Sequence, residues 1–167
     1  MEETTKGARQ MMADLLQKMG IETEIEAHIE EGILNIEIMS DERGILIGKH
    51  GRTIESMQIL MNRMVHKQFK NSVRINIDVG GYKKNRSDFI KKMANRIGES
   101  VKKTGKGVSI GPFNAQERRI IHITFKEDPS IKTGSTGEGE WKKIKIFPSK
   151  KQVTNLLVFN HTQDNEN

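Results

Sequence analysis

Residues 44–65 read GILIGKHGRTIESMQILMNRMV, and this stretch decides the fold of the first half of the chain. Its centre is a tetrapeptide bounded by two glycines, Gly48-Lys49-His50-Gly51, between a short apolar segment and a helical pattern. Glycines at both ends let the backbone turn tightly and approach a ligand without a Cβ in the way. Free amides in such a turn and the dipole of the next helix favour a phosphate group, and Lys49 and Arg52 add positive charge. A lone G-x-x-G is also common as a plain turn, so the flanking elements decide between the two interpretations.

Those flanking segments predict a small domain of mixed structure over residues 1–81. An apolar stripe at helical spacing comes first, and two alternating segments, 21–29 and 34–38, predict an antiparallel hairpin whose polar face is acidic. After the turn, residues 54–65 predict a helix packed through methionines, and the alternating segment 73–79 predicts a third strand. The resulting order is helix, strand, strand, short helix, helix, strand.

The second half predicts a connecting helix and then another small module. Residues 82–106 hold a long polar helix that ends at Thr104-Gly105. Residues 107–150 hold a helix whose start, from Asn114 to Glu117, has the Asn-x-x-Glu pattern of a capping box. The tail, 151–167, is polar and is expected to be loosely held. The short strands of the module are predicted at 108–110, 131–133 and 141–147, with a glycine-rich loop at 134–139.

The second candidate site is the pair Arg118 and His122 in the first turns of the capped helix. Residues four apart share a helix face, so a guanidinium and an imidazole would project side by side, which suits a phosphate group. The competing interpretation is that Arg118 pairs with a nearby carboxylate while His122 packs against the sheet.

The two halves together resemble a known family. The run 44–65 in its element order resembles a type II KH domain, and GPFNAQERRIIH followed by KTGSTGEGEWKKIKIFP resembles an R-three-H domain. From about residue 5 to Pro148 the chain resembles the bacterial Jag family, the SpoIIIJ-associated RNA-binding proteins. The resemblance implies an α+β fold: a KH domain of order αββααβ, with helices on one face of a three-stranded sheet, followed by a small α/β R-three-H domain.

The resemblance also implies which residues bind RNA. The GXXG turn of a KH domain clamps the backbone of about four nucleotides. Lys142 and Lys143 stand where the family commonly has arginine; lysine keeps the charge but loses the bidentate geometry. The implied RNA-binding residues are Gly48, Lys49, His50, Gly51, Arg52, Arg118, His122, Lys142 and Lys143, and the apolar side of a base groove would be formed by Ile45, Ile47, Leu34 and Ile36 with Ile38.

One departure concerns the start of the chain. The family usually begins with a small Jag domain and a charged linker, whereas Met1 here lies almost directly before the first predicted KH helix. We therefore expect a member without that domain or a piece of a longer one, and functions of the Jag domain are not transferred.

Composition and charge exclude several classes of protein. The net charge of +6 resolves into −6 over residues 1–40, +14 over 41–153 and −2 over the tail, and the basic block suits a polyanion, although a plain soluble surface can also be basic. No segment approaches the roughly 18 apolar residues of a spanning helix, and no secretory signal opens the chain, so neither membrane insertion nor export is expected. The absence of cysteine excludes disulfides and thiolate zinc sites. A cytoplasmic location follows as the expectation.

Catalysis has little support in the sequence. A P-loop needs glycine where Arg43 stands and a hydroxyl residue where His50 stands. The five histidines show no paired metal spacing, and Ser135 has no evident base partner. We therefore predict that the chain is not an enzyme and has no cofactor, metal or small-molecule substrate.

The sequence predicts a single-stranded RNA-binding protein. By resemblance it is a bacterial post-transcriptional regulator linked to cell elongation and division, with a second KH-domain protein or another copy of itself as a candidate partner. Two alternatives remain open: an adaptor that binds protein through the acidic edge at Glu22, Glu24 and Glu26, and a protein that binds single-stranded DNA.

Overall fold

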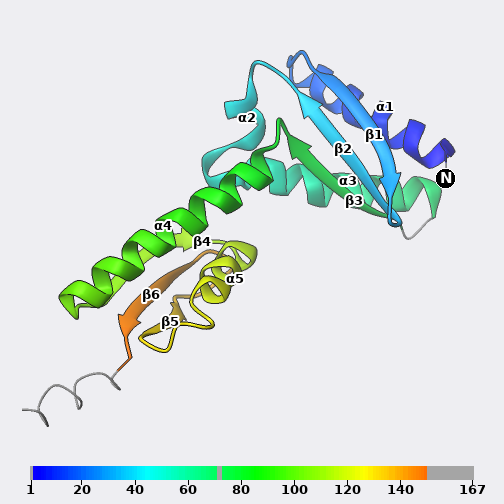
Figure 1. The fold of residues 1–167 in the computed structure, drawn as a ribbon. Coiled ribbons are helices and arrows are strands. Elements are labelled where there is room, and N and C mark those ends of the chain that lie inside the picture. The colour runs from blue at the N-terminus through cyan, green and yellow to red at the C-terminus, as the bar shows by residue number, and fades with distance from the viewer. Residues whose placement is uncertain (1, 71–72, 150–167) are drawn as a thin grey trace, which may run out of the picture. The chain divides into compact units, whose positions relative to one another are not determined.

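The computed structural model describes residues 2–70 and 73–149 and divides after Asn85 into two units (Figure 1). The first unit is Met1–Asn85 and the second is Arg86–Asn167. The polar tail predicted for 151–167 lies outside the described residues.

The first unit has the predicted α+β order. Its sheet runs β1-β2-β3, with β1 and β2 antiparallel and β2 and β3 parallel. Both the fold class and the order αββααβ are therefore confirmed. The elements are α1 (Glu2–Lys18), β1 (Glu24–Glu30), β2 (Ile33–Met39), α2 (Arg43–Ile47), a 3-10 turn η1 (Lys49–Gly51), α3 (Arg52–Phe69) and β3 (Arg74–Val79).

The core of the first unit lies between one face of this sheet and the helices α1 and α3, which Figure 1 shows on the same side of it. Strand alternation sends every second residue of β2 and β3 into this layer. Each such side chain contributes about 1.5–3 kcal/mol when fully buried. The largest fully buried members are Met12, Leu16, Leu34, Ile36, Ile38, Leu46, Met61, Ile75 and Ile77.

The outer edge of β3 is closed by side chains of α3. Ile77 donates its amide to Gln58 Oε1 at 2.9 Å, and Ile75 donates its amide to Asn62 Oδ1 at 3.0 Å. These bonds satisfy backbone groups that an edge strand otherwise presents to another chain. They also fix the position of α3 along the sheet, and with it the turn at the start of α3.

The second unit packs two helices on one face of a sheet ordered β4-β6-β5, in which both pairings are antiparallel. Its core joins Ile90, Ala94 and Val101 of α4 to Ile144 and Ile146 of β6. The elements are α4 (Tyr82–Thr104), β4 (Val108–Phe113), α5 (Ala115–Thr124), β5 (Ile131–Thr136) and β6 (Lys142–Pro148).

Two sequence-based boundaries need correction. The sequence predicts that residues 82–106 connect two domains, but from Arg86 onward α4 belongs to the second unit because its apolar stripe forms part of that core. The second module therefore begins before 107. Strands β4 and β5 also extend beyond 110 and 133, so β5 includes the first part of the expected glycine loop, Gly134 to Thr136.

A buried carboxylate ties α4 to the start of α5. Glu117 is only 5% exposed, and its Oε1 accepts a hydrogen bond from Arg86 Nε at 2.7 Å. Its Oε2 accepts from the amide of Asn114 at 3.2 Å, while Asn114 Oδ1 accepts from the amide of Glu117 at 2.9 Å. The predicted capping box is confirmed. The ion pair with Arg86 compensates the free-energy cost of burying the carboxylate of Glu117.

Among the described residues, no helix combines the length and the apolarity that crossing a membrane requires.

A pH-dependent contact lies at the other end of α4. Lys102 Nζ lies 2.8 Å from Asp128 Oδ2, and Ser130 donates its amide and its hydroxyl to Asp128 Oδ1. The hydrogen bond from Lys102, followed by those from Ser130, lowers the pKa of Asp128 to about 2 from its ordinary value of 3.8. Because the folded pKa is depressed, the stabilisation is complete above the unfolded value near 3.8 and is lost as the pH falls through 2.

We expect Asp128→Asn to weaken the pH dependence of the second unit's stability between the unfolded pKa of this carboxyl, 3.8, and its folded pKa of about 2. The measurement is urea unfolding followed by the fluorescence of Trp141, the single tryptophan of the chain. Glu127→Gln is the matched control, since it removes an exposed carboxylate from the neighbouring position. If wild type and Asp128→Asn lose stability in parallel over this range, the Lys102–Asp128 contact does not stabilise the unit.

Candidate nucleic-acid interface

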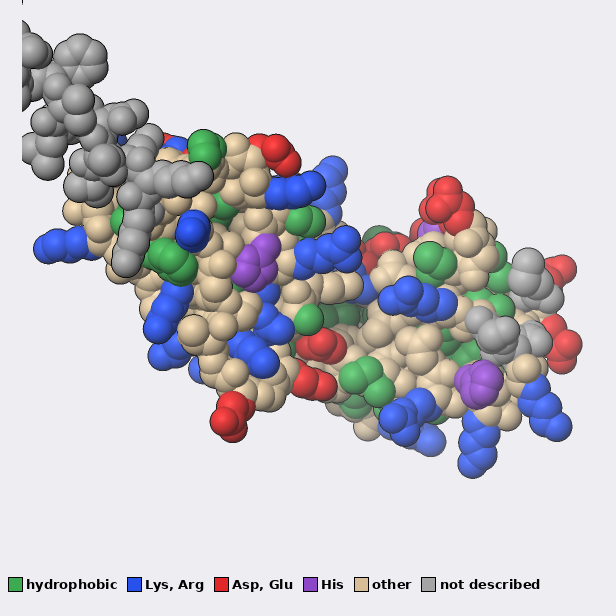
Figure 2. Space-filling model, turned by 90° about the horizontal axis from the view of Figure 1, so that it is seen from below, with side chains coloured by type: hydrophobic (Ala, Val, Ile, Leu, Met, Phe, Trp, Pro, Cys, Tyr) green, Lys and Arg blue, Asp and Glu red, His purple; other side chains and the backbone are tan. Residues whose placement is uncertain are grey.

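Positive charge is spread over the second unit. Figure 2 shows Lys and Arg side chains across the surface of this unit (left), with few acidic groups among them. In the first unit (right), acidic side chains are more mixed with basic ones on the face shown. Each candidate site is therefore described within its own unit.

The turn Gly48–Gly51 depends on its two glycines. Gly48 has φ 70° and Gly51 has φ 85°, both in the left-handed region that L side chains rarely adopt. A Cβ on Gly48 would lie 2.1 Å from Thr53 Oγ1, and a Cβ on Gly51 would lie 3.0 Å from the hydroxyl oxygen of Tyr82. No other residue fits these two positions without a shift of the surrounding structure.

The amides of these glycines are occupied inside the protein. Gly48 donates to the carbonyl of Gly44 at 2.9 Å, and Gly51 donates to the carbonyl of Gly48 at 3.3 Å. They are therefore not available for a phosphate in this conformation, contrary to the amide clamp that the sequence suggested. The exposed cations at the turn are Lys49 and Arg52, while His50 is half-buried with φ 59°. The ammonium group of Lys49 has no hydrogen bond or ion pair to any residue that the structure describes.

The apolar base groove predicted for the first unit is only partly present. Ile45 is 56% exposed on α2, just before the turn, and Ile47 is half-buried against the core. Leu34 and Ile36 are fully buried, as is Ile38, because the alternation of β2 points them at the helices. The prediction that these strand residues contact a base is wrong.

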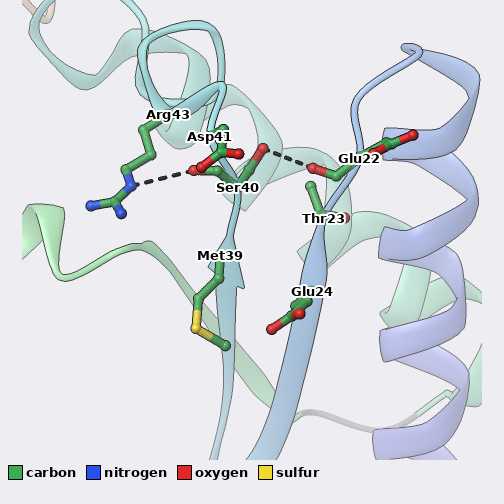
Figure 3. Close-up of a pocket in the computed structure, with 7 residues that line it drawn as sticks. All are labelled: Glu22, Thr23, Glu24, Met39, Ser40, Asp41 and Arg43. Atoms are coloured by element: carbon green, nitrogen blue, oxygen red, sulfur yellow. Dashed lines mark hydrogen bonds between the residues drawn. The ribbon is translucent and has the colours of Figure 1, made fainter.

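An open recess in the first unit has the wrong charge for a phosphate (Figure 3). It lies between the start of β1 and the end of β2, where Ser40 donates to the carbonyl of Glu22 at 2.8 Å and Arg43 Nε donates to the carbonyl of Ser40 at 3.3 Å. Three carboxylates line it against one guanidinium, so it repels a polyanion. The lining residues are Glu22, Thr23, Glu24, Met39, Ser40, Asp41 and Arg43.

In the second unit, Arg118 both holds the local structure and keeps donors for a ligand. Its Nη1 donates to the carbonyls of Phe113 and Glu140, each at 2.8 Å. A guanidinium has five N–H donors, and the other three have no protein partner among residues 2–70 and 73–149. The expected alternative of a carboxylate partner is wrong, because both partners are backbone carbonyls.

His122 contacts hydroxyl groups of strand β5. Its Nδ1 lies 2.6 Å from Thr133 Oγ1, and its Nε2 lies 3.3 Å from Ser135 Oγ. Sequence reasoning missed Thr133 and described Ser135 as lacking a base partner, which the structure corrects. The available signal was the Thr-x-Ser alternation, which puts both hydroxyls on one face of a strand.

This His122 cluster lacks the orienting group of a hydrolytic triad. A serine nucleophile is activated by a histidine whose other nitrogen is held by a carboxylate. Here that nitrogen faces the hydroxyl of Thr133. Within the described part of the chain, no group of three or more His, Asp or Glu is placed to hold a metal ion either. Hydroxyls, an imidazole and a nearby guanidinium suit the binding of an anion better than acyl transfer.

Lys142 and Lys143 cannot serve one site together. They are successive residues of β6, so their side chains leave opposite faces of the sheet. Lys142 is on the same face as Ile144 and Ile146, the face that α4 and α5 cover, and is half-buried. Lys143 is exposed on the other face.

Comparison with known proteins agrees with this two-unit arrangement. Residues 6–77 match the family model described as the KhpA/KhpB KH domain, and residues 88–148 match the model of the R-three-H domain. The fold and the two matches define a protein in which a KH domain is followed by an R-three-H domain. The chain thus carries the KH and R-three-H domains that the resemblance to the Jag family predicted. The KH and R-three-H families are not known enzyme families.

Several curated relatives of this chain carry the name "RNA-binding protein KhpB". The one from Clostridium symbiosum is 34% identical over 128 residues, which is 77% of this chain and 58% of the relative. The one from Bacillus subtilis is 31% identical, and the matched region is 65% of this chain and 53% of the relative. The one from Lactiplantibacillus plantarum is 25% identical, and the matched region is 79% of this chain and 41% of the relative. The chain thus spans about half the length of the curated relatives it matches.

We expect Gly48→Ala to destabilise the first unit by about 1–3 kcal/mol, because it combines a left-handed φ with a Cβ clash against Thr53. The measurement is hydrogen exchange of the amides of β2 and β3 by mass spectrometry. Gly44→Ala is the matched control, since its Cβ would meet nothing within 4 Å and its φ lies outside the left-handed region. Equal exchange in the two variants would show that the turn tolerates other conformations.

Proposed function

We propose that this chain binds single-stranded RNA through two separate phosphate-contacting sites, one in each unit. The observation that carries the proposal is the GKHG turn, whose glycines hold a backbone conformation closed to other residues and present Lys49 exposed and unpaired within the described structure. The guanidinium of Arg118, with three remaining donors beside the His122 hydroxyl cluster, provides the second site. The names of the KhpB relatives support RNA as the ligand.

In this proposal, charge contributes most of the affinity and little of the sequence preference. Phosphate contacts release counterions and make binding depend strongly on salt, whereas sequence is read at base edges. The chain has only six Phe, one Trp and one Tyr, which is few for base-stacking platforms of the RRM type. Two weak sites on one chain raise the overall affinity through effective concentration.

The proposal extends to the cellular role that the family resemblance implied. The chain acts as a post-transcriptional regulator in the cytoplasm, linked to cell elongation and division, and has no enzymatic activity. A second KH-domain protein, or another copy of the chain, is the proposed protein partner. These statements rest on family resemblance alone.

We expect Lys49→Asp with His50→Asp to weaken RNA binding roughly tenfold or more, because a charge-assisted contact is lost and repulsion replaces it. The measurement is fluorescence anisotropy with a short single-stranded RNA. The double variant His66→Asp with Lys67→Asp is matched in composition and charge at the other end of α3. Circular dichroism confirms that both variants fold. If the two variants bind equally well, the turn does not contact RNA; a DNA strand of equal sequence tests whether the ligand is specifically RNA.

We expect Arg118→Ala to lower the slope of log affinity against log salt by about 0.7, the value for one phosphate contact on a single strand. Arg118→Lys should keep most of the slope but bind more weakly, since lysine lacks the guanidinium fork. Arg119→Ala is the control, because it removes the same charge from the adjacent exposed position. Trp141 fluorescence reports whether the neighbouring loop keeps its structure. A slope that stays at the wild-type value would make Arg118 a purely structural residue.

A further inference from the structure

The outer face of the β4-β6-β5 sheet has features that neither candidate site uses. The helices α4 and α5 pack on the face that carries Ile144 and Ile146, so the alternate residues of the three strands form the opposite face. Lys143, Lys145 and Phe147 of β6 lie there, and Lys132 of β5 is directly opposite Phe147. The positions paired with Lys143 and Lys145 are small: Ser109 of β4, and Gly134 and Thr136 of β5.

The charge on this face has one sign. Lys132, Lys143 and Lys145 are exposed, and none of their ammonium groups has a hydrogen bond or ion pair within the described structure. The three strands contain no Asp or Glu at all. A second copy of this face would be repelled by the same charges, whereas a polyanion would be attracted.

One aromatic ring stands uncovered among these lysines. Phe147 is 38% exposed, although its neighbours Ile144 and Ile146 on the same strand are fully buried. A Cβ on Gly134 would lie 3.9 Å from the Phe147 ring, and a Cβ on Gly107 would lie 3.1 Å from Phe147 Cβ. Larger residues at these two positions would pack against Phe147, so the glycines leave access to it.

We propose that this outer sheet face is a further contact surface for single-stranded RNA, on which a base stacks against Phe147 while Lys132, Lys143 and Lys145 contact phosphates. An aromatic side chain framed by lysines is the arrangement by which sheets bind single strands without reading sequence. The surface lies on the other side of the sheet from Arg118 and His122, so a strand held there does not compete for their donors. The proposal rests on the proposed RNA-binding function.

The test compares two triple variants of the full chain that change the same charge. Lys132→Gln, Lys143→Gln and Lys145→Gln should lower the salt slope of RNA binding by about 2, as expected for three contacts on a single strand. Lys91→Gln, Lys92→Gln and Lys103→Gln, on exposed positions of α4, should leave the slope unchanged. Phe147→Leu should weaken binding roughly fivefold or more, while Phe147→Tyr retains it. Trp141 fluorescence and a thermal melt establish that each variant folds.

A measurement on the wild-type chain does not depend on any variant. Photocrosslinking to an RNA that contains 4-thiouridine, followed by peptide mapping, should label the peptide that carries Phe147. The outer face is not a contact surface if the two triple variants have the same salt slope and the Phe147 peptide stays unlabelled. The proposed function still stands in that case, provided that the wild type binds RNA and the variant at Lys49 and His50 binds it more weakly. If wild type binds no RNA, both proposals fall. If a photoreactive acidic peptide labelled the Phe147 peptide and the RNA did not, the inference would also be overturned.

Discussion

The second unit depends on a carboxylate that is almost completely removed from water. Glu117 and Thr4 are the only buried polar residues among those that the structure describes, and Glu117 is the charged one. Burying an ion costs several kcal/mol unless partners surround it, and here Arg86 and the amide of Asn114 take one oxygen each. The Arg86–Glu117 ion pair therefore fixes the start of α5 against α4. Because Arg118 is the next residue, its reach to the carbonyls of Phe113 and Glu140 is set by the same contact.

The first unit reaches a comparable result with neutral groups. Gln58 and Asn62 hydrogen-bond the free edge of β3 and so hold α3 along the sheet, which determines where the chain enters the helix. Gly48 and Gly51 then let the backbone turn within the space that Thr53 and Tyr82 leave. The exposed position of Lys49 follows from this geometry. In both units the position of a cation is thus set by the backbone that carries it.

Periodicity and local chemistry predicted most of the fold but only part of the sites. The helix from Tyr82 to Thr104 and the capping box at Asn114 were predicted from residues close together in sequence, where spacing decides the structure. The contacts of His122 with Ser135 and of Arg118 with Glu140 join residues far apart in sequence, about which spacing says nothing. The glycine amides are occupied by local bonds to the carbonyls of Gly44 and Gly48, which depend on backbone conformation and not on residue type. The β4 boundary was missed because Pro112 normally stops a strand, yet β4 lies at the sheet edge, where a proline is tolerated. Leu34 and Ile36 were misassigned because an apolar strand residue faces the core before it faces a ligand.

The pair Lys142–Lys143 shows how a strand converts adjacent residues into different functions. In sequence they form one basic dipeptide, and in space they lie on opposite faces of β6. One face is covered by α4 and α5 and carries the isoleucines that stabilise the unit, and the lysine on this face is half-buried. The other face has no helix of the described second unit over it and contributes little to the core, so its side chains are free to be basic, small or aromatic. A unit whose sheet has helices on one side alone thus leaves a whole face open, and this face is the one that the proposed contact with a polyanion would use.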